Sequence, residues 1–393
     1  MKIAYVTPRY GTEIVGGAEN GARGLAEHLA SDLGWEVEAL TTCAIDNRTW
    51  ADEYDEGASD LNGVRVHRFR SKAGRDPGFD RFSRKVMGQP FRAAPRDQAQ
   101  WIRMQGPHNP QLLDAIASSD ADLLVFTPYL YEPTAMGLPL VGDRAVFHPA
   151  AHEEQPIHLP LFRGVFGAAR GLSFYTHSER RLVERLFPVA SSAQIVLGLG
   201  VDESEGDPGA ARAALSIGDR PFLHYQGRVD NGKGTTVLAE FFAAYKRRRP
   251  GPLALVLSGP VDDLPPSHPD IVVTGLVDPE LMWGLFRAST VYVHPSAYES
   301  FSITLMDAWE AGRPVLVNGR CEVTREHCER SGGGLWFDGY ASFEAALDRL
   351  LADAALRTQL GDAGRAYVDA HYRWPALVAR YRTFLERVAG TRR

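Results

Sequence analysis

Short apolar segments alternate with amphipathic segments along most of the chain, and the alternation forms two series. The first series predicts strands at residues 3–7, 37–41, 64–69, 123–127, 145–148 and 171–176. The second predicts strands at residues 222–226, 253–258, 271–273, 290–294 and 314–317. Consecutive strands that are separated by helices pair in parallel, so each series predicts a parallel sheet with helices on both faces. The chain is therefore expected to be an α/β protein of two domains, which its 393 residues also favour.

The domain boundaries follow from the gap between the two series and from the last amphipathic segment. We expect an N-terminal domain of residues 1–197, a second domain of residues 198–372, and a C-terminal helical segment of residues 373–393. In that segment, residues 375–388 place apolar side chains at helical spacing, which predicts a helix that packs against a core.

Residues 298–312, YESFSITLMDAWEAG, lie between a predicted strand and a predicted helix. Glu299 falls in the loop, and Asp307 lies about one turn inside the helix. The backbone N–H groups of residues 301–303 would be the unpaired donors of the helix start, which attracts an anion. Two carboxylates beside an anion site accept hydrogen bonds from hydroxyl groups, so the stretch fits a nucleotide sugar. The alternative is a capped helix with one surface acid and one solvated acid.

Residues 227–235, GRVDNGKGT, form a second candidate anion site. The segment is close to a phosphate-binding G-x-x-x-x-G-K loop, but Gly234 stands where Ser or Thr must hold Mg²⁺. Phosphoryl transfer is therefore disfavoured. Arg228 can donate two hydrogen bonds to phosphate oxygens and Lys233 supplies a compact charge, so together they can neutralise a diphosphate without a metal. The alternative is that both are surface bases in a turn.

The N-terminal half places further polar residues just after predicted strands. Gly16 and Gly17 lie at a strand-to-helix junction, where the backbone can approach a phosphate, or they form only a tight turn. His148 ends another strand, and His152 follows it beside two glutamates. A single His at a strand end is more often structural, but two His beside two acids favour a functional role. Because ligands of parallel sheets bind at the carboxyl ends of strands, we expect these residues to lie near a ligand.

Together these segments resemble the retaining nucleotide-sugar glycosyltransferases of family 4, which have the GT-B fold. That family has the pattern E-x7-E in a PS-x-x-E-G-F-G context and a G-R-x-x-x-x-K-G segment. The residues that match the first pattern are Pro295, Ser296, Glu299, Phe301, Ala308, Gly312 and Pro314. The departures are Ser300 and Ser302 in place of two glycines, and Asp307 in place of the second glutamate. The segment GGAE and residues 195–202, which end in G-V-D, are similar to the first loop and the hinge of the family.

The resemblance implies two Rossmann-like domains that face each other across a cleft, with the C-terminal helix crossing back to the first domain, where Trp374 would anchor it. Residues 1–197 would be the acceptor-side domain, and residues 198–372 the donor domain. The implied catalytic residues are Arg228, Lys233, Glu299 and His152. The implied donor-binding residues are Gly16, Gly17, His148, Phe301, Ser302, Ile303 and Asp307. Glu299 would hold the sugar hydroxyls, Asp307 the ribose, and His152, or His148 as second choice, the sugar.

The implied reaction moves a sugar from a UDP- or GDP-sugar to a glycan, a lipid-linked acceptor or a small molecule, with retention of configuration. The leaving phosphate would take the proton of the acceptor, without a covalent nucleophile, a metal or a permanently bound cofactor. The alternatives are a sugar-nucleotide epimerase of the same fold and a non-catalytic protein that binds carbohydrate or nucleotide. A phosphorylase would also share the fold, but no lysine motif for pyridoxal phosphate is recognisable.

The distribution of charge along the chain indicates which kinds of partner the protein is expected to bind. The net charge is −6, yet residues 63–103 hold eleven Lys or Arg and three Asp. A segment at residues 79–91 places Phe79, Phe82, Val86 and Met87 on one helical face, which predicts a peripheral contact with an anionic membrane, a site for a phosphorylated acceptor, or an exposed helix. The overall charge does not favour nucleic acid as a partner. The chain has three cysteines without metal spacing, and no signal peptide or membrane-spanning segment is recognisable. These features predict a cytoplasmic protein, which could also bind peripherally to the inner face of the membrane.

Overall fold

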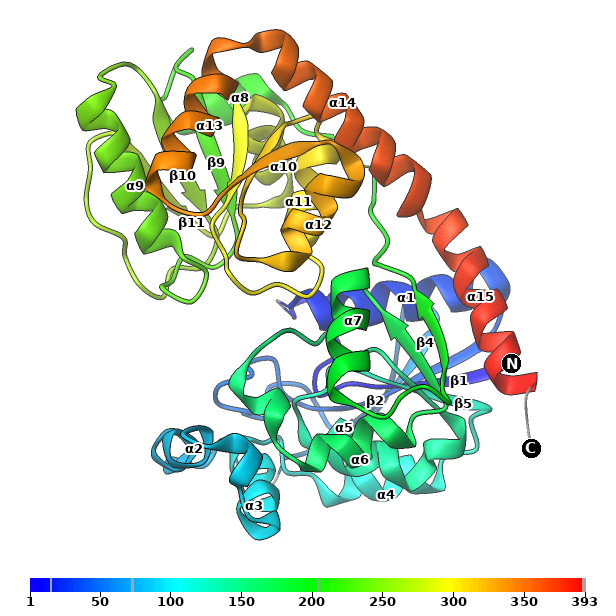
Figure 1. Ribbon diagram of the computed structural model, residues 1–393. Helices are drawn as coiled ribbons and strands as arrows, with labels where there is room; N and C mark the ends of the chain where they lie inside the picture. Colours follow the sequence, from blue (N-terminus) through cyan, green and yellow to red (C-terminus); the bar gives the residue numbers. More distant parts are fainter. Residues whose placement is uncertain (15, 72–73, 204, 391–393) are drawn as a thin grey trace. The chain divides into compact units, whose positions relative to one another are not determined.

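The computed structural model describes residues 1–14, 16–71, 74–203 and 205–390, which fold into two compact units (Figure 1). The first unit comprises Met1–Gly200 and the C-terminal segment from Trp374, and the second unit comprises Val201–Arg373. Residues 72 and 73, in the basic stretch 63–103, and residues 391–393, in the predicted C-terminal segment, lie outside the described residues.

The first unit contains an eight-stranded sheet with the strand order β3-β4-β2-β1-β5-β6-β7-β8. Its strands are β1 (Lys2–Val6), β2 (Glu36–Thr42), β3 (Gly57–Leu61), β4 (Val64–Phe69), β5 (Leu123–Phe126), β6 (Ala145–Phe147), β7 (Gly171–Phe174) and β8 (Ala193–Val196). All neighbouring pairs are parallel except β3 and β4. The central strand β5, LLVF, is buried throughout, as expected for a parallel sheet that is covered on both faces. The edge strand β3, GASDL, is mostly exposed and lacks the apolar pattern that predicts a strand.

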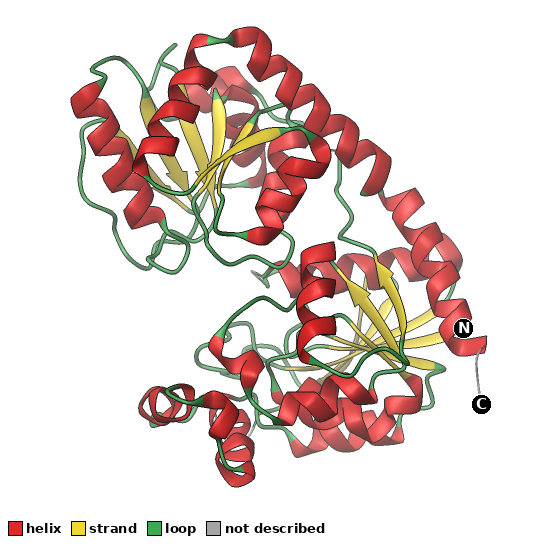
Figure 2. Cartoon of the chain, in the orientation of Figure 1, coloured by secondary structure: helices red, strands yellow, loops and turns green. Residues whose placement is uncertain are grey.

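Helices cover both faces of the sheet in each unit (Figure 2). The helices of the first unit are α1 (Gly17–Leu33), α2 (Phe79–Met87), α3 (Pro95–Gln105), α4 (Pro110–Ser118), α5 (Glu132–Gly137), α6 (Leu161–Ala168), α7 (His177–Leu186) and α15 (Trp374–Gly390). Three short 3-10 helices accompany them, η1 (Pro90–Arg92), η2 (Leu138–Arg144) and η3 (Gln155–His158). Helices α3, α4 and α5 were not predicted from the sequence.

Helix α15 returns the C-terminal end of the chain to the first unit, which confirms that part of the predicted fold. Its apolar face, with Leu377, Tyr381 and Phe384, lies in the same buried cluster as residues of β1 and α1. Trp374 stacks on His28 with 4.1 Å between ring centroids. The indole leaves no room for a Cβ atom at Gly200, so this glycine permits the close approach. Trp374 therefore holds the start of α15 against the first unit, as expected.

The second unit contains a six-stranded sheet that is parallel throughout, with the strand order β11-β10-β9-β12-β13-β14. Its strands are β9 (Phe222–Gln226), β10 (Ala254–Ser258), β11 (Ile271–Gly275), β12 (Val291–His294), β13 (Val315–Asn318) and β14 (Gly334–Phe337). Its helices are α8 (Pro208–Ala214), α9 (Thr235–Arg248), α10 (Pro279–Ala288), α11 (Ile303–Glu310), α12 (Glu322–Ser331), α13 (Tyr340–Ala352) and α14 (Ala354–His371). The two parallel-sheet α/β units confirm the predicted fold class.

Candidate functional site

The strand order of the second sheet places a topological switch point between β9 and β12. The chain runs from β9 to β10 and β11 on one side, and then returns to β12, β13 and β14 on the other side. In open parallel sheets a ligand binds outside the carboxyl ends of the two strands that flank such a point. The loop after β9 holds Arg228 and Lys233, and the loop after β12 holds Glu299. The fold therefore brings the two predicted segments of this unit to the same edge of the sheet.

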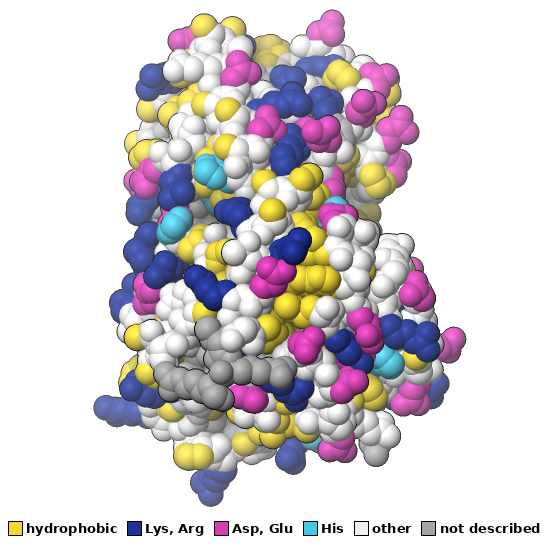
Figure 3. All heavy atoms as spheres, turned by 90° about the vertical axis from the view of Figure 1, so that its right-hand side faces the viewer, with side chains coloured by type: hydrophobic (Ala, Val, Ile, Leu, Met, Phe, Trp, Pro, Cys, Tyr) yellow, Lys and Arg dark blue, Asp and Glu magenta, His cyan; other side chains and the backbone are white. Residues whose placement is uncertain are grey.

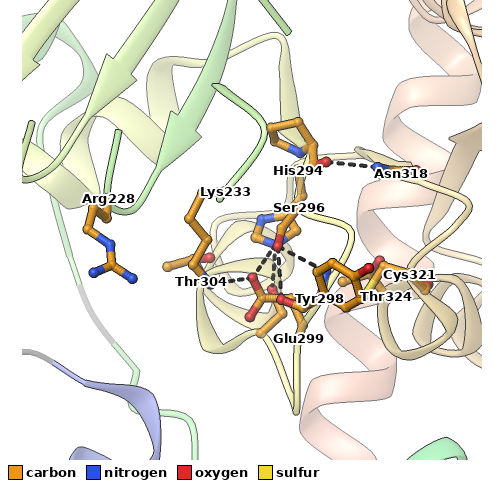
Figure 4. A network of polar contacts seen from close by, with 12 residues as sticks. Arg228, Lys233, His294, Ser296, Tyr298, Glu299, Thr304, Asn318, Cys321 and Thr324 are labelled. Atoms are coloured by element: carbon orange, nitrogen blue, oxygen red, sulfur yellow. Dashed lines mark hydrogen bonds and ion pairs between the residues drawn. The ribbon is translucent and has the colours of Figure 1, made fainter. Parts of the chain in front are cut away.

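Lys233 and Glu299 form an ion pair at this edge (Figure 4). The Lys233 Nζ atom lies 2.7 Å from Glu299 Oε1, and His294 Nε2 lies 3.1 Å from the same oxygen. The Glu299 side chain is only 12% exposed. The two loops also approach closely at Gly234, which has φ +77° and where a Cβ atom would lie 2.8 Å from the Pro295 carbonyl oxygen. A glycine is therefore required where a metal-binding loop would carry Ser or Thr.

Asp230 organises the loop that carries both cations. Arg228 Nε lies 2.7 Å from Asp230 Oδ2, and the backbone N–H of Lys233 donates to Asp230 Oδ1 at 2.6 Å. The Arg228 side chain is 46% exposed, and among the described residues no hydrogen bond or ion pair joins it to Glu299. The ammonium of Lys233 is therefore held at the carboxylate of Glu299, while the guanidinium of Arg228 lies toward solvent on the same loop.

The electrostatics of the site keep Glu299 ionised. Burial favours the neutral acid, but the charge of Lys233 and the hydrogen bond from His294 outweigh it, so the pKa of Glu299 lies well below its ordinary value. The pKa of Glu299 is lower in the folded state than in the unfolded state, where it is near 4.3. The ionised carboxylate therefore stabilises the folded state above that pH, and this stabilisation is lost as the pH falls through the folded-state pKa. At neutral pH the site therefore presents a carboxylate that accepts hydrogen bonds.

The start of α11 follows Glu299 directly. Phe301 is buried, and Ile303 is the first residue of the helix. The N–H groups of a first helical turn have no partner within the helix, and Ser302 provides no side-chain cap for them. These donors fit the predicted anion site, but the roles of Phe301, Ser302 and Ile303 in binding a donor stay predictions.

The backbone conformation of residue 302 fits the glycine of the family pattern, and it predicts a stability effect for Ser302. Ser302 has φ +69°, a left-handed conformation that costs an L-residue about 1–2 kcal/mol, whereas Ser300 does not have a positive φ. Ser302→Gly is therefore expected to raise the free energy of unfolding by about 1 kcal/mol, measured by urea denaturation. Ser300→Gly is the matched control and should lower it by about 0.5–1 kcal/mol. Equal losses of stability in both variants would contradict this account.

Asp307 lies on α11 as predicted, but it is not simply a solvated acid. Burial first, and then the charges of Asp202 and Glu310, raise the pKa of Asp307 to about 8. Its carboxyl group is therefore mostly protonated at neutral pH. Asp202 was predicted only as the end of the hinge, and its effect on Asp307 could not be derived from the sequence.

The predicted glycine pair of the first unit lies beside a buried ion pair. Gly16 precedes α1, and a Cβ atom there would lie 2.4 Å from Glu19 Oε2. Glu19 accepts a hydrogen bond from Arg9 Nε at 3.1 Å, and Arg9 also donates to the carbonyl oxygen of Ile45 at 2.9 Å. Gly16 therefore packs directly against this ion pair, whereas Gly17 has open space around it. Sequence reasoning missed Arg9, and a ligand role for the two glycines stays a prediction.

The two predicted histidines of the first unit differ in their surroundings. His148 is buried, its Nε2 lies 2.8 Å from the hydroxyl of Tyr381 on α15, and burial lowers its pKa to about 3. These contacts are those of a structural histidine that ties β6 to the C-terminal helix. His152 is partly exposed, and its Nε2 lies 3.6 Å from Glu154 Oε2. Of the two, only His152 has a side chain that is accessible to a ligand, and its predicted sugar contact stays a prediction.

Known proteins resemble the chain in sequence. The family model of group 1 glycosyl transferases matches residues 210–367. An uncharacterized glycosyltransferase of Methanocaldococcus jannaschii is 24% identical over 95% of both chains. A GDP-mannose-dependent alpha-(1-6)-phosphatidylinositol monomannoside mannosyltransferase of Mycobacterium tuberculosis is 28% identical over 54% of this chain and 60% of its own length.

Solved structures resemble the chain over its whole length. Sucrose-phosphate synthase of Thermosynechococcus elongatus superposes with a TM-score of 0.74 and 19% identity, covering 100% of both chains. HepE of Anabaena, solved in complex with UDP and glucose, gives a TM-score of 0.68 and 14% identity, covering 98% of this chain and 99% of that chain. The chain therefore has the GT-B fold, and the part that carries Arg228, Lys233 and Glu299 matches the group 1 glycosyl transferases.

Proposed function

We propose that the protein is a retaining glycosyltransferase of family 4, which transfers a sugar from a nucleoside-diphosphate sugar to an acceptor hydroxyl. The observation that carries the proposal is the ion pair of Lys233 and Glu299 at the switch point between β9 and β12. A cation for a diphosphate and a carboxylate for sugar hydroxyls lie side by side there, next to the start of a helix. The mannosyltransferase relative is GDP-mannose-dependent, and HepE was solved with UDP and glucose, which supports a nucleotide-sugar donor.

In this proposal the charges of the second unit stabilise the departing diphosphate. Arg228, Lys233 and the N–H groups at the start of α11 donate to phosphate oxygens as negative charge develops on them, which is electrostatic catalysis by preorganised donors. Glu299 accepts hydrogen bonds from the sugar hydroxyls. The acceptor oxygen forms its bond to the anomeric carbon on the face from which the phosphate leaves, and its proton passes to the leaving phosphate oxygen.

The proposal is tested by product analysis. The protein is incubated with UDP-glucose and with GDP-mannose, in the presence of sugar phosphates, inositol phosphates and lipid extracts as acceptors, and the products are separated by mass spectrometry. Formation of a nucleoside diphosphate together with a glycosylated acceptor supports the transferase. A sugar nucleotide that changes configuration without release of diphosphate identifies an epimerase. Tight binding of nucleotide with no turnover identifies a non-catalytic binding protein.

The raised pKa of Asp307 predicts how donor binding depends on pH. If ribose hydroxyls donate to the ionised carboxylate, binding must release the proton, so the apparent affinity follows the ionised fraction. Because the pKa is about 8, we expect the affinity for UDP-glucose or GDP-mannose to rise up to about tenfold per pH unit from pH 6 and to level off above 8. Calorimetric titration at several pH values measures this, and Asp307→Asn should abolish the dependence. An equally steep dependence in Asp307→Asn would contradict the ribose contact.

The proposal also includes the membrane contact that the sequence predicts for the basic segment of the first unit, residues 63–103. Helices α2 and α3, joined by η1, lie at the periphery of the first unit (Figure 1), but Phe79, Val86 and Met87 are buried in its core. The predicted apolar face of α2 therefore packs inside the protein, and a membrane contact would rest on the exposed residues of the segment. Phe91 in η1 is 65% exposed. Exposed cations of this segment are Arg81, Arg84, Lys85, Arg92, Arg96 and Arg103. By contrast, basic and acidic side chains are mixed on the face that Figure 3 shows. No described helix is long and apolar enough to cross a membrane.

This segment is expected to bind anionic vesicles. Cosedimentation with vesicles that contain 30% phosphatidylglycerol should exceed that with pure phosphatidylcholine and fall at high salt, since each cation near the surface contributes about 1 kcal/mol. The combined change Arg81→Glu, Arg84→Glu, Lys85→Glu and Phe91→Ser should abolish it. Charge reversal of Arg247, Arg248 and Arg249 at the end of α9 is the control and should leave binding intact. Equal binding of both vesicle types would count against the contact.

A further inference from the structure

The two oxygens of Glu299 have different surroundings. Oε1 accepts hydrogen bonds from Lys233 Nζ at 2.7 Å and from His294 Nε2 at 3.1 Å. Within the described part of the chain, no hydrogen bond or ion pair is made by Oε2. One oxygen is therefore occupied, and the other remains available to accept from a ligand.

His294 is itself held from its other side. It is the last residue of β12 and is buried, and its Nδ1 lies 3.1 Å from the hydroxyl of Tyr292. The Tyr292 hydroxyl is also 2.8 Å from Thr304 Oγ1, in the first turn of α11. Thr304, Tyr292, His294 and Glu299 thus form a continuous chain of hydrogen bonds, and part of it is seen in Figure 4. This chain links the end of a central strand to the helix that follows Glu299.

The chemistry of these groups fixes the direction of the hydrogen bonds. An ionised carboxylate only accepts, so His294 Nε2 must carry a proton and donate it to Glu299. The Tyr292 hydroxyl donates to Thr304 Oγ1 at 2.8 Å, and its oxygen lies 3.1 Å from His294 Nδ1. Nε2 is therefore the ring nitrogen that donates to Glu299, while Nδ1 faces Tyr292.

Lys233, unlike His294, has a second binding partner in the proposed function, the diphosphate of the donor. Its ammonium is a compact charge on a flexible stem, and its side chain is 31% exposed. The proposed function assigns the same ammonium to the diphosphate of the donor. An incoming diphosphate therefore competes with Glu299 for Lys233, and Glu299 would lose its closest partner when the donor binds.

We propose that His294 is a positioning residue that holds Glu299 Oε1 when Lys233 turns to the donor diphosphate, so that Oε2 stays aimed at the sugar hydroxyls. This inference rests on the proposed function. It assigns Tyr292 and Thr304 to the support of the His294 ring, because they fix the nitrogen that does not face Glu299. Without a donor, Lys233 pairs with Glu299. When the donor binds, Lys233 contacts the diphosphate instead, and Glu299 keeps its contact with His294.

The test separates the sugar from the diphosphate. For His294→Leu, kcat with a nucleotide-sugar donor should fall about 10–100-fold, while the Kd for UDP or GDP alone stays within about twofold. His294→Gln keeps an N–H donor and should recover most of the loss, and Tyr292→Phe should give an intermediate value. The control is His268→Leu, in the loop before β11. This histidine contacts Asp270 and Phe242 and not Glu299, so its loss should change neither constant by more than about twofold.

Three outcomes decide the inference. Turnover of His294→Leu equal to that of His268→Leu overturns it and leaves the proposed function standing. A parallel loss of diphosphate affinity and turnover in His294→Leu also overturns it, because a general disturbance of the site then explains the data. If the wild-type protein neither binds a nucleoside diphosphate nor transfers a sugar, the proposed function fails and the inference fails with it.

Discussion

Replacement of Glu299 by Gln is expected to lower kcat/KM for sugar transfer by about 10²–10³-fold, because a preorganised charged partner of the reacting sugar is lost. The substitution keeps the shape of the side chain and removes only its charge. The carboxylate is ionised in the resting protein, since Lys233 and His294 together overcome the effect of burial on its pKa. The amide is a weaker acceptor for the sugar hydroxyls and presents an N–H group where the carboxylate has only acceptors.

Initial rates of donor consumption across a range of donor concentrations measure this effect. Glu344→Gln is the matched control, because Glu344 is also a buried acid of the second unit that pairs with a base, Arg248 on α9. Its rate should stay near that of the wild type. A transfer rate for Glu299→Gln within a few fold of the Glu344→Gln rate would show that Glu299 does not hold the reacting sugar.

Replacement of Lys233 by Met is expected to weaken the binding of UDP or GDP by about 10–100-fold, because a hydrogen bond to a charged group contributes about 1.5–3 kcal/mol. The thioether keeps most of the aliphatic stem. The same variant leaves Glu299 with His294 as its remaining partner, so the pKa of Glu299 should rise toward its ordinary value. The stability that Glu299 contributes above pH 4 should shrink accordingly, and unfolding curves at pH 7 and pH 4 should differ less than in the wild type.

Lys246→Met provides the comparison for this variant. Lys246 lies near the other end of α9, where it pairs with Asp270 at 3.0 Å and donates to the carbonyl oxygen of Leu253 at 3.0 Å. Its loss should reduce stability without any change in nucleotide affinity. If Lys246→Met and Lys233→Met weakened nucleotide binding equally, the effect of Lys233 would be one of stability and the diphosphate contact would be wrong.

Most of the fold could be predicted from periodicity, because strands of a covered parallel sheet are continuous apolar segments. Strands β5 and β12 are examples, since both are buried at every position. The exceptions are strands at sheet edges. One of them is β8, which is partly exposed at every position and overlaps the predicted hinge at residues 195 and 196. Strand β3 lies at the edge, pairs antiparallel and is mostly exposed, so its sequence, GASDL, is not a continuous apolar segment. Strand β14 is also at an edge and has only four residues, of which two are partly or fully exposed.

The candidate site could be predicted in part, because residues after parallel strands meet at one edge of the sheet. Lys233 and Glu299 were expected to share a ligand, and their side chains are in contact. Asp230 and His294 were not predicted, although the first lies between Arg228 and Lys233 and the second ends β12. Their contacts depend on how the two loops pack, which periodicity does not contain. The burial of Asp307 beside Asp202 is likewise a tertiary effect.

The central claim is that the second unit holds a diphosphate with Arg228, Lys233 and the start of α11. Calorimetric titration of the wild-type protein with UDP and with GDP, in a buffer that contains EDTA, tests it most directly. We predict that the protein binds at least one of the two nucleotides at micromolar concentration. The double variant Arg228→Ala, Lys233→Met should lose this binding. Absence of binding for both nucleotides, or undiminished binding in the double variant, would contradict the account.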